Sequence, residues 1–163
     1  DKDVARIDLK VHDVDGFWRS LRLEPFWVKI PHEEVRFNFG KATWDDDQVT
    51  KLQESLERIR SSMKKHGHKG LELQLYIAGY TDTVGSKASN RELSRRRARA
   101  IGRWFRQQGL EVPIYYQGFG ESVLAVETPD ETKNKKNRRA VYILGNAQPP
   151  ESETIPQSNW REL

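Results

Sequence analysis

One arginine occupies an unusual place in the sequence. Arg97 lies four residues after Leu93 and four before Ile101, so it falls in the middle of the apolar stripe of a predicted helix. A free guanidinium is costly to remove from water. We therefore expect Arg97 either to extend its charge past the apolar surface into solvent or to meet an anionic partner. In the second arrangement its planar fork could bind a carboxylate through two parallel hydrogen bonds.

Asp82 is a candidate for the opposite charge in the same neighbourhood. It follows a predicted strand over residues 71–79, on the loop that leads to the helix carrying Arg97. Taken alone, an Asp in such a loop is more often a turn former than a ligand. An acid and a base on opposite sides of one cleft could nevertheless bind a zwitterion, with Asp82 holding an ammonium group and Arg97 a carboxylate.

The sequence gives little support to catalysis. It has no cysteine, which excludes disulfides, thiolate chemistry and cysteine-ligated zinc. It also lacks a Gly-x-Ser-x-Gly motif and a phosphate-binding glycine loop. His66 and His68 could bind a metal weakly, but exposed histidines at a helix end are a commoner explanation of this pattern. We therefore predict a binding module that is not an enzyme and needs no cofactor.

Length and composition indicate one folded domain. The 163 residues are 36% hydrophobic and include five Trp, five Tyr and six Phe, which is too apolar for a disordered chain. The net charge of +4 suits an anionic partner. No apolar stretch approaches the roughly 20 residues that span a bilayer. Because the chain starts with Asp1 and resembles no signal peptide, we expect a mature or excised piece whose targeting and anchoring segments lie outside it.

The spacing of apolar residues predicts an α/β fold, a two-layer sandwich in which helices cover one face of a mixed β-sheet. Period-two alternation indicates strands, and steps of three and four indicate helices. Asp45 and Gln48 resemble a capping box at the start of the first helix. In chain order the pattern is βαβαββ: strand 34–39, a helix from 45 to about 66, strand 71–77, a helix from about 90 to 108, and strands 112–116 and 140–144.

The two ends of the chain differ from this central part, which we place at residues 33–145. Residues 1–32 predict an N-terminal extension of short strands with a turn at Asp15-Gly16. Pro25 and Pro31 favour edge strands or an arm packed on the main body. Residues 146–163 are expected to form a polar, mobile C-terminal tail, from which Trp160 could dock.

Four separated blocks of sequence resemble the OmpA-like peptidoglycan-binding domain family. With the strand that precedes them, the resemblance covers roughly residues 33–144, and the order and spacing of the blocks fit the family. It implies the same sandwich fold and non-covalent binding of the peptide stem of the cell wall through its diaminopimelate side chain. The blocks are Gly-Tyr-Thr-Asp-Thr-Val-Gly at 79–85, Asn-Arg-Glu-Leu-Ser-Arg-Arg-Arg-Ala at 90–98, Gly-Phe-Gly-Glu at 118–121 and Asn-Arg-Arg at 137–139.

The resemblance also implies roles for individual residues. Asp82 and Arg97 match the family's Asp and Arg that hold the ammonium and the carboxylate of diaminopimelate. Thr81 and Asn90 would shape the loop, and Leu93 would line the pocket. The remaining matches are backbone groups near Asn38, which would meet the ligand, and Asn137 and Arg138, for which fixing the last strand and loop is as good an interpretation as ligand contact.

The sequence departs from the family pattern at two positions. Tyr80 stands where a His is most common, and Asn38 replaces a frequent Asp, a change that could alter contacts to the rest of the peptide. Neither removes the charged pair. The resemblance therefore implies a periplasmic domain that anchors an outer-membrane or envelope protein to the wall, tethered by a segment outside this chain, with other envelope proteins as possible partners.

A second hypothesis comes from the basic residues. The segment 91–106 holds seven arginines against one glutamate, and 133–139 adds five more cations, so this face could attract nucleic acid or another polyanion. Against it, the arginines are spread around the helix and no recognition motif is present. A solvated helix face is the simpler interpretation, and no nucleic acid is expected as a partner.

Overall fold

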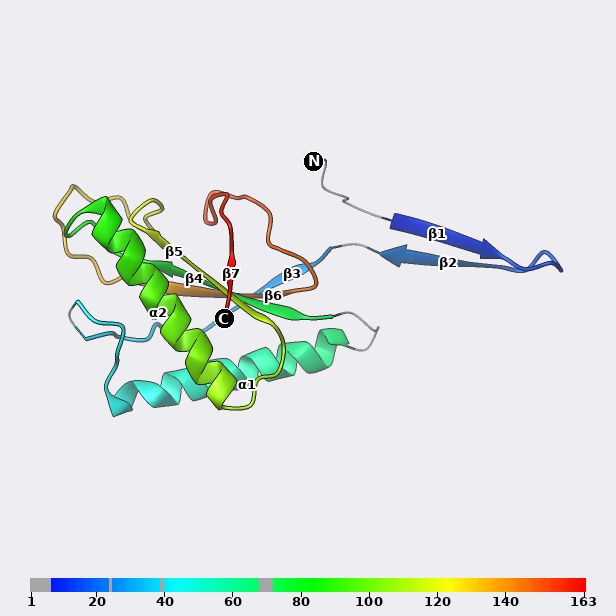
Figure 1. Cartoon of the computed structure of the whole chain (residues 1–163), viewed down its shortest axis with the longest axis horizontal. Helices are drawn as coiled ribbons and strands as arrows, with labels where there is room; N and C mark the ends of the chain where they lie inside the picture. Colours follow the sequence, from blue (N-terminus) through cyan, green and yellow to red (C-terminus); the bar gives the residue numbers. More distant parts are fainter. Residues whose placement is uncertain (1–6, 24, 39, 68–71) are drawn as a thin grey trace.

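A five-stranded mixed sheet forms the main body of the protein, in a computed structural model that describes residues 7–23, 25–38, 40–67 and 72–163. The strand order is β3-β6-β4-β5-β7, with β4 parallel to β5 and every other neighbour antiparallel (Figure 1). The succession β3-α1-β4-α2-β5-β6 confirms the predicted βαβαββ pattern and the fold class. The strands are β3 (Trp27–Ile30), β4 (Gln74–Tyr80), β5 (Ile114–Gly120), β6 (Ala140–Gly145) and β7 (Arg161–Glu162).

Helix α1 (Val49–His66) has the apolar face that its spacing predicts. Leu52, Leu56 and Ile59 are buried on it. The predicted capping box is wrong, because Asp45 makes no side-chain cap hydrogen bond. The amide of Gln48 instead accepts a hydrogen bond from the backbone N–H of Arg36 at 2.9 Å, and a short 3-10 turn, η1 (Asp46–Gln48), precedes the helix.

Helix α2 (Lys87–Gln107) begins slightly before the predicted position because Ser86 caps it, accepting a hydrogen bond from the backbone N–H of Ser89. The helix lies very close to the sheet. A Cβ at Gly118 would be 2.2 Å from the backbone nitrogen of Arg95, and one at Gly79 would be 2.4 Å from the carbonyl oxygen of Ser94. Glycine at these two strand positions therefore sets how near α2, and Arg97 on it, comes to the strand ends.

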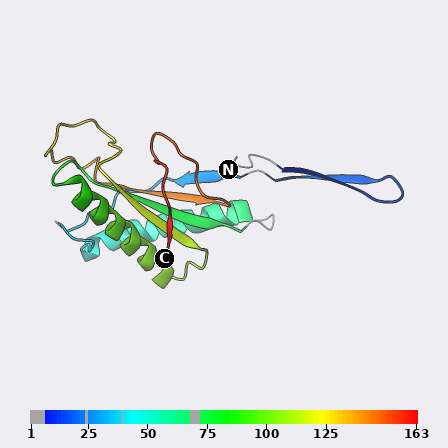
Figure 2. The same cartoon turned by 45° about the horizontal axis from the view of Figure 1, so that its top comes forward.

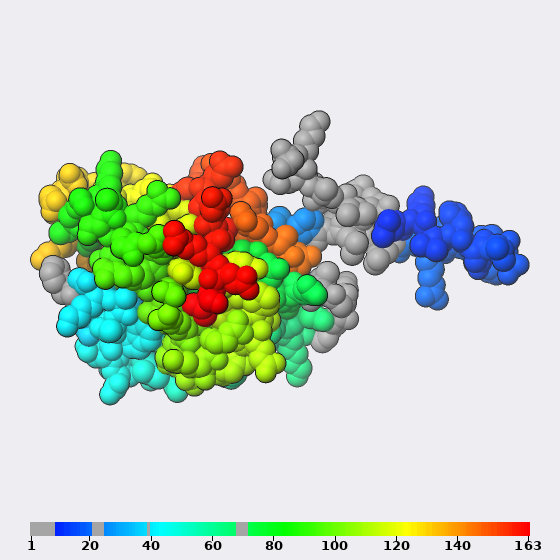
Figure 3. Space-filling model, in the orientation of Figure 1, coloured from blue at the N-terminus to red at the C-terminus, as the bar shows by residue number. Residues whose placement is uncertain are grey.

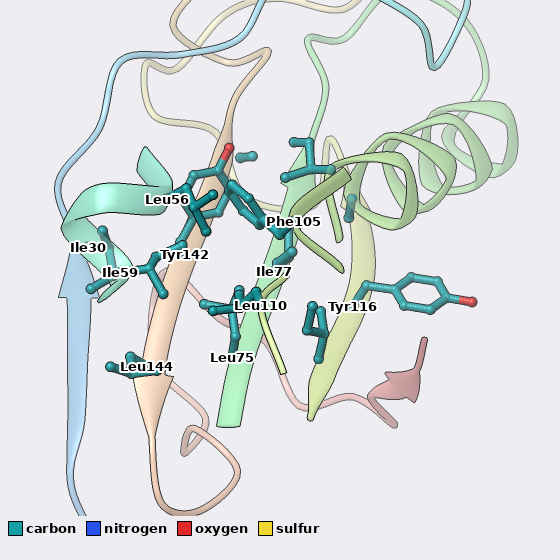
Figure 4. Close-up of a cluster of buried hydrophobic side chains, with 14 of the residues drawn as sticks. Ile30, Leu56, Ile59, Leu75, Ile77, Phe105, Leu110, Tyr116, Tyr142 and Leu144 are labelled. Atoms are coloured by element: carbon teal, nitrogen blue, oxygen red, sulfur yellow. The ribbon is translucent and has the colours of Figure 1, made fainter. Parts of the chain in front are cut away.

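Both faces of the sheet are covered. The helices pack on one face, around side chains such as Leu75, Ile77 and Phe105 (Figures 2 and 4). The C-terminal segment crosses the other face, where Trp160 meets Tyr76 edge to face with ring centroids 5.1 Å apart. The expected docking of Trp160 is thus confirmed, but the expectation of a mobile tail is wrong, because this segment also supplies strand β7.

The first strand of the sheet differs from the prediction. Residues 27–30, expected in the N-terminal extension, pair with β6, whereas residues 34–38 form no strand and Phe39 lies outside the described residues. The backbone groups of Ala140, at the start of β6, form hydrogen bonds with side chains instead of with another strand. Ala140 donates its N–H to the carboxylate of Glu34 at 2.8 Å, and its carbonyl oxygen is 3.1 Å from Nε2 of His32. Strand pairing therefore ends at Ile30.

A two-stranded hairpin, β1 (Ile7–His12) with β2 (Trp18–Leu23), precedes the main sheet and projects away from it (Figures 1 and 3). Its turn is held by Asp13, whose carboxylate accepts hydrogen bonds from the N–H groups of Asp15 and Phe17. The expected strands are present. Of the two alternatives drawn from Pro25 and Pro31, the edge strand is confirmed, because β3 lies between these prolines at the edge of the main sheet, whereas the described residues of the hairpin do not form an arm packed on the body. The two sheet faces are already covered by the helices and by residues 146–163.

Candidate functional site

Asp82 lies on the loop that follows β4, and its side chain is nearly buried. Its side chain is 10% exposed. Oδ2 accepts hydrogen bonds from Nη1 of Arg138 at 2.6 Å and from the backbone N–H of Asn134 at 3.2 Å. The carboxylate is therefore oriented by a cation and a backbone donor from the loop before β6, which the sequence could not assign to it.

Arg97 is buried on the sheet side of α2, with 8% of the residue exposed. Its Nε donates to the carbonyl oxygen of Lys41 at 3.1 Å, and its guanidinium carbon lies 4.9 Å from the centroid of the Phe37 ring. Burial and, to a lesser extent, the positive charge of Arg138 lower the pKa of Arg97 to about 10. The charge of Asp82 acts on this pKa in the opposite direction, but no carboxylate of a described residue is within ion-pair distance of Arg97.

Asp82 and Arg97 line the same pocket, whose volume is about 420 Å³. It opens between the end of β4, the first half of α2 and the loops around residues 40 and 133. We name it the Asp82 pocket. Of the seven residues predicted for the site, the structure brings six together here: Thr81, Asp82, Asn90, Leu93, Arg97 and Arg138.

Asn90 hydrogen-bonds the loop that carries Asp82. It is buried, and its Nδ2 donates to the backbone oxygen of Asp82 at 3.3 Å and to Oε2 of Glu121 at 2.5 Å. It thereby ties the ends of β4 and β5 to α2. Glu121 lies in one of the four sequence blocks, but its role could not be predicted, because its partner Asn90 is distant in the sequence.

Thr81 and Leu93 complete the wall. Thr81 is 1% exposed, and its backbone N–H donates to the carbonyl oxygen of Gly120 at 2.8 Å. Its hydroxyl oxygen is buried without a hydrogen-bond partner. Most buried polar groups have a hydrogen-bond partner, so this unpaired hydroxyl is an exception that a ligand could satisfy. Leu93, half-buried, supplies an apolar surface on the α2 side of the pocket.

The Asn-Arg-Arg block has divided roles. Asn137 is fully buried and structural, because its side-chain amide binds the backbone of Ala125 and Val126. Arg138 belongs to the pocket through its bond to Asp82. Arg139 turns to the other side, with its guanidinium 4.1 Å from the centroid of the Tyr80 ring.

Asn38 is not brought to the pocket. Its side-chain amide instead donates to Thr43 at 3.4 Å and to Asp45 at 3.3 Å, closing the turn that precedes α1. The neighbouring residues Phe37 and Gly40 line the pocket in its place. The sequence pattern predicts Phe37 in a strand, whereas the structure places it at the pocket and against Arg97.

The other sequence candidates form no comparable site. Within the described ranges, no group of three or more His, Asp or Glu side chains could hold a metal ion. The ring of His66 packs against Phe26 with centroids 5.4 Å apart, and His68 lies outside the described residues. Four of the seven arginines in 91–106 are engaged within the protein. Arg95 pairs with Glu92, Arg97 is buried, Arg99 lies over the Tyr116 ring at 5.9 Å from its centroid, and Arg106 binds the backbone oxygens of Leu110 and Val112.

Comparison with known proteins gives a family and several relatives. The profile of the OmpA family matches residues 36–138. The chain is 30% identical over 122 residues to the sodium-type flagellar protein MotY of Vibrio parahaemolyticus serotype O3:K6, a match covering 74% of this chain and 41% of that protein. It is 32% identical over 90 residues to outer membrane protein A of Escherichia coli O157:H7, covering 55% and 24%. The chain thus spans less than half the length of these relatives.

Solved structures share the fold. The peptidoglycan-associated lipoprotein from Burkholderia pseudomallei superposes with a TM-score of 0.54 and 23% identity, over 68% of this chain and 88% of that one. A periplasmic domain of Helicobacter pylori MotB gives a TM-score of 0.53 and 17% identity, over 74% and 81%. Among the residues described here, no helix has the length and apolar character that crossing a membrane requires.

Proposed function

Because this chain belongs to the OmpA family, we propose that it binds peptidoglycan by holding the diaminopimelate side chain of the stem peptide between Asp82 and Arg97. Domains of this family generally bind peptidoglycan, and the family is not enzymatic.

The observation that carries the proposal is that the buried guanidinium of Arg97 is only partly hydrogen-bonded. Its only hydrogen bond to a described residue uses Nε. The outer edge of the guanidinium is therefore available for a carboxylate, which would bind through two parallel hydrogen bonds. A carboxylate would also offset the cost of burying this charge, the main cause of its lowered pKa.

Asp82 supplies the second half of the recognition. Its carboxylate is held in place by Arg138 and Asn134 and lines the same pocket as Arg97. A ligand ammonium would meet this fixed acceptor, and the unpaired hydroxyl of Thr81 offers a further hydrogen bond nearby. The combination selects a group that carries both charges at a fixed separation, which is what the free end of diaminopimelate presents.

The relatives suggest where such binding would act. One is named an outer membrane protein, and two structural neighbours are a peptidoglycan-associated lipoprotein and a periplasmic domain. We place this chain in the periplasm as the part of an envelope protein that holds it to the cell wall, with a segment outside this sequence providing the tether to the outer membrane.

Co-sedimentation with purified diaminopimelate-type sacculi tests the proposal. The chain should pellet with sacculi, and Asp82→Ala or Arg97→Ala should reduce the bound fraction at least about tenfold, as expected for losing one charged hydrogen-bonding partner. Asp46→Ala and Arg103→Ala, which change exposed residues of the same types outside the pocket, are the matched controls.

A parallel binding assay with duplex DNA at two salt concentrations tests the competing hypothesis. Salt-sensitive binding to DNA with no retention by sacculi would favour the arginine-rich face of α2 as a polyanion site. Folded Asp82→Ala and Arg97→Ala variants that bind sacculi normally would show that the charged pair is not the recognition site.

A further inference from the structure

A second pocket adjoins the Asp82 pocket. Its volume is about 550 Å³, and it lies between residues 33–37, the start of α1, the end of β4 and residues 135–140. Phe37, Arg97 and Arg138 line both pockets, so these three side chains form the wall between them. We name this second space the Lys135 pocket.

Positive charge predominates in the Lys135 pocket. Arg36, Lys135 and Lys136 line it, and no carboxylate of a described residue is within ion-pair distance of them. Arg138 and Arg139 add two further cations, although Arg138 is already paired with Asp82.

The two acidic residues that line this pocket do not balance these cations. The carboxylate of Glu33 is 3.7 Å from Nζ of Lys51, on the α1 side. Glu34 is bonded to the backbone N–H of Ala140, and burial raises its pKa to about 7, so near neutral pH it carries only part of a negative charge. The pocket therefore favours an anion.

Arg139 provides an independent sign of unmet hydrogen bonding. Its Nη2 donates to the carbonyl oxygen of Val123 at 3.3 Å, while Nη1 is buried without a partner. A buried, unpartnered guanidinium nitrogen is costly. A negative charge in the adjoining pocket would lower the electrostatic part of that cost for Arg139 and, across the shared wall, for Arg97.

We propose that the Lys135 pocket binds a second carboxylate of the same stem peptide, on the residue next to the diaminopimelate whose side-chain end occupies the Asp82 pocket. This inference rests on the proposed function, because it requires diaminopimelate in the Asp82 pocket and places the neighbouring residue on the other side of Phe37, Arg97 and Arg138. Lys135 and Lys136 supply the charge for the second group. The chain would then recognise an acidic peptide at two adjoining positions, which distinguishes a stem peptide from free diaminopimelate.

Isothermal titration of the chain with three ligands tests this proposal. They are free meso-diaminopimelate, a short peptide in which the residue beside diaminopimelate bears a free carboxylate, and the same peptide with that carboxylate amidated. The wild-type chain should bind the acid peptide about three- to tenfold more tightly than the amide, as expected for one partly exposed charged contact. Lys135→Gln/Lys136→Gln should lose this preference and still bind free diaminopimelate.

The matched control removes two charges elsewhere. Lys64→Gln/Lys65→Gln changes exposed residues at the end of α1 that do not line the pocket, and it should keep the preference for the acid peptide. Equal affinity of the wild-type chain for acid and amide would overturn the second subsite while leaving diaminopimelate binding intact. Failure of the folded wild-type chain to bind any of the three ligands would instead overturn the proposed function, and the second subsite with it.

Discussion

Asp82 and Arg97 differ in how fully their charged groups are paired within the protein. The carboxylate of Asp82 already has Arg138 at 2.6 Å, whereas the guanidinium of Arg97 bonds only a backbone oxygen. An arriving ammonium would share Asp82 with an existing cation, whereas no carboxylate of a described residue is within ion-pair distance of the Arg97 guanidinium that an arriving carboxylate would meet. The carboxylate of the ligand should therefore contribute more to affinity than its ammonium does, and Arg97 should be the more sensitive position.

Glu34 should make stability depend on pH. Burial raises its pKa from 4.5 to about 7, so between these values the folded state binds more protons than the unfolded state. The stabilisation is complete below about pH 4.5 and is lost as pH rises through 7. Because the side chain is 41% exposed, solvent limits the effect to about 1 kcal/mol. Urea unfolding from pH 4.5 to 7.5 should show the free energy of unfolding falling more steeply for the wild type than for Glu34→Gln.

The comparison with Glu34→Gln is needed because His32 acts in the opposite direction. Burial lowers the pKa of His32, so its contribution to stability increases as pH rises towards 6.5. The Gln variant keeps an oxygen acceptor for the N–H of Ala140 and retains His32. Parallel pH profiles for the two proteins would mean that the Glu34 carboxyl ionises as freely as it does in an unfolded chain.

At the scale of elements, the contact between α2 and the strands beside it positions Arg97. Gly118→Ala would place a Cβ 2.2 Å from the backbone nitrogen of Arg95, and backbone cannot move as a flexible side chain can. We expect α2 to shift and the free energy of unfolding to fall by about 3 kcal/mol or more. Binding to sacculi should weaken too, even under conditions where the variant is fully folded.

Gly67→Ala is the control for this element-scale prediction. Gly67 has a φ of −75°, and the nearest atom to an added Cβ is 3.9 Å away, in ordinary contact. Its free energy of unfolding, measured by urea denaturation beside Gly118→Ala, should stay within about 0.5 kcal/mol of wild type. If the two alanine variants were equally stable, close packing of α2 on β5 would not be what fixes the helix.

Over the whole molecule, the spacing of apolar residues predicted most helices and strands correctly, but it did not predict the contacts between segments that are distant in the sequence. The spacing of Leu52, Leu56 and Ile59 predicted α1, and the place of Arg97 in an apolar stripe singled it out, with burial as one of two alternatives. The family resemblance read from four blocks is confirmed by the profile match over residues 36–138. These features depend on neighbours within a few residues or on short motifs, which a sequence displays directly.

The remaining features depend on contacts across long separations. Pairing ends at Ile30 because the side chains of His32 and Glu34 take the backbone of Ala140. Arg138 becomes the partner of Asp82 because the loop before β6 returns to the end of β4. No local pattern encodes either contact.

Titration of the chain with two short peptides, blocked at both ends, tests the central claim most directly. One contains meso-diaminopimelate, and the other has lysine in its place, which keeps the side-chain ammonium but lacks the carboxylate beside it that is proposed to meet Arg97. The account predicts that the wild-type chain binds the diaminopimelate peptide at least about tenfold more tightly than the lysine peptide, and that Arg97→Ala removes the difference. Equal affinity of the folded wild-type chain for the two peptides, or no binding of the diaminopimelate peptide, would contradict it.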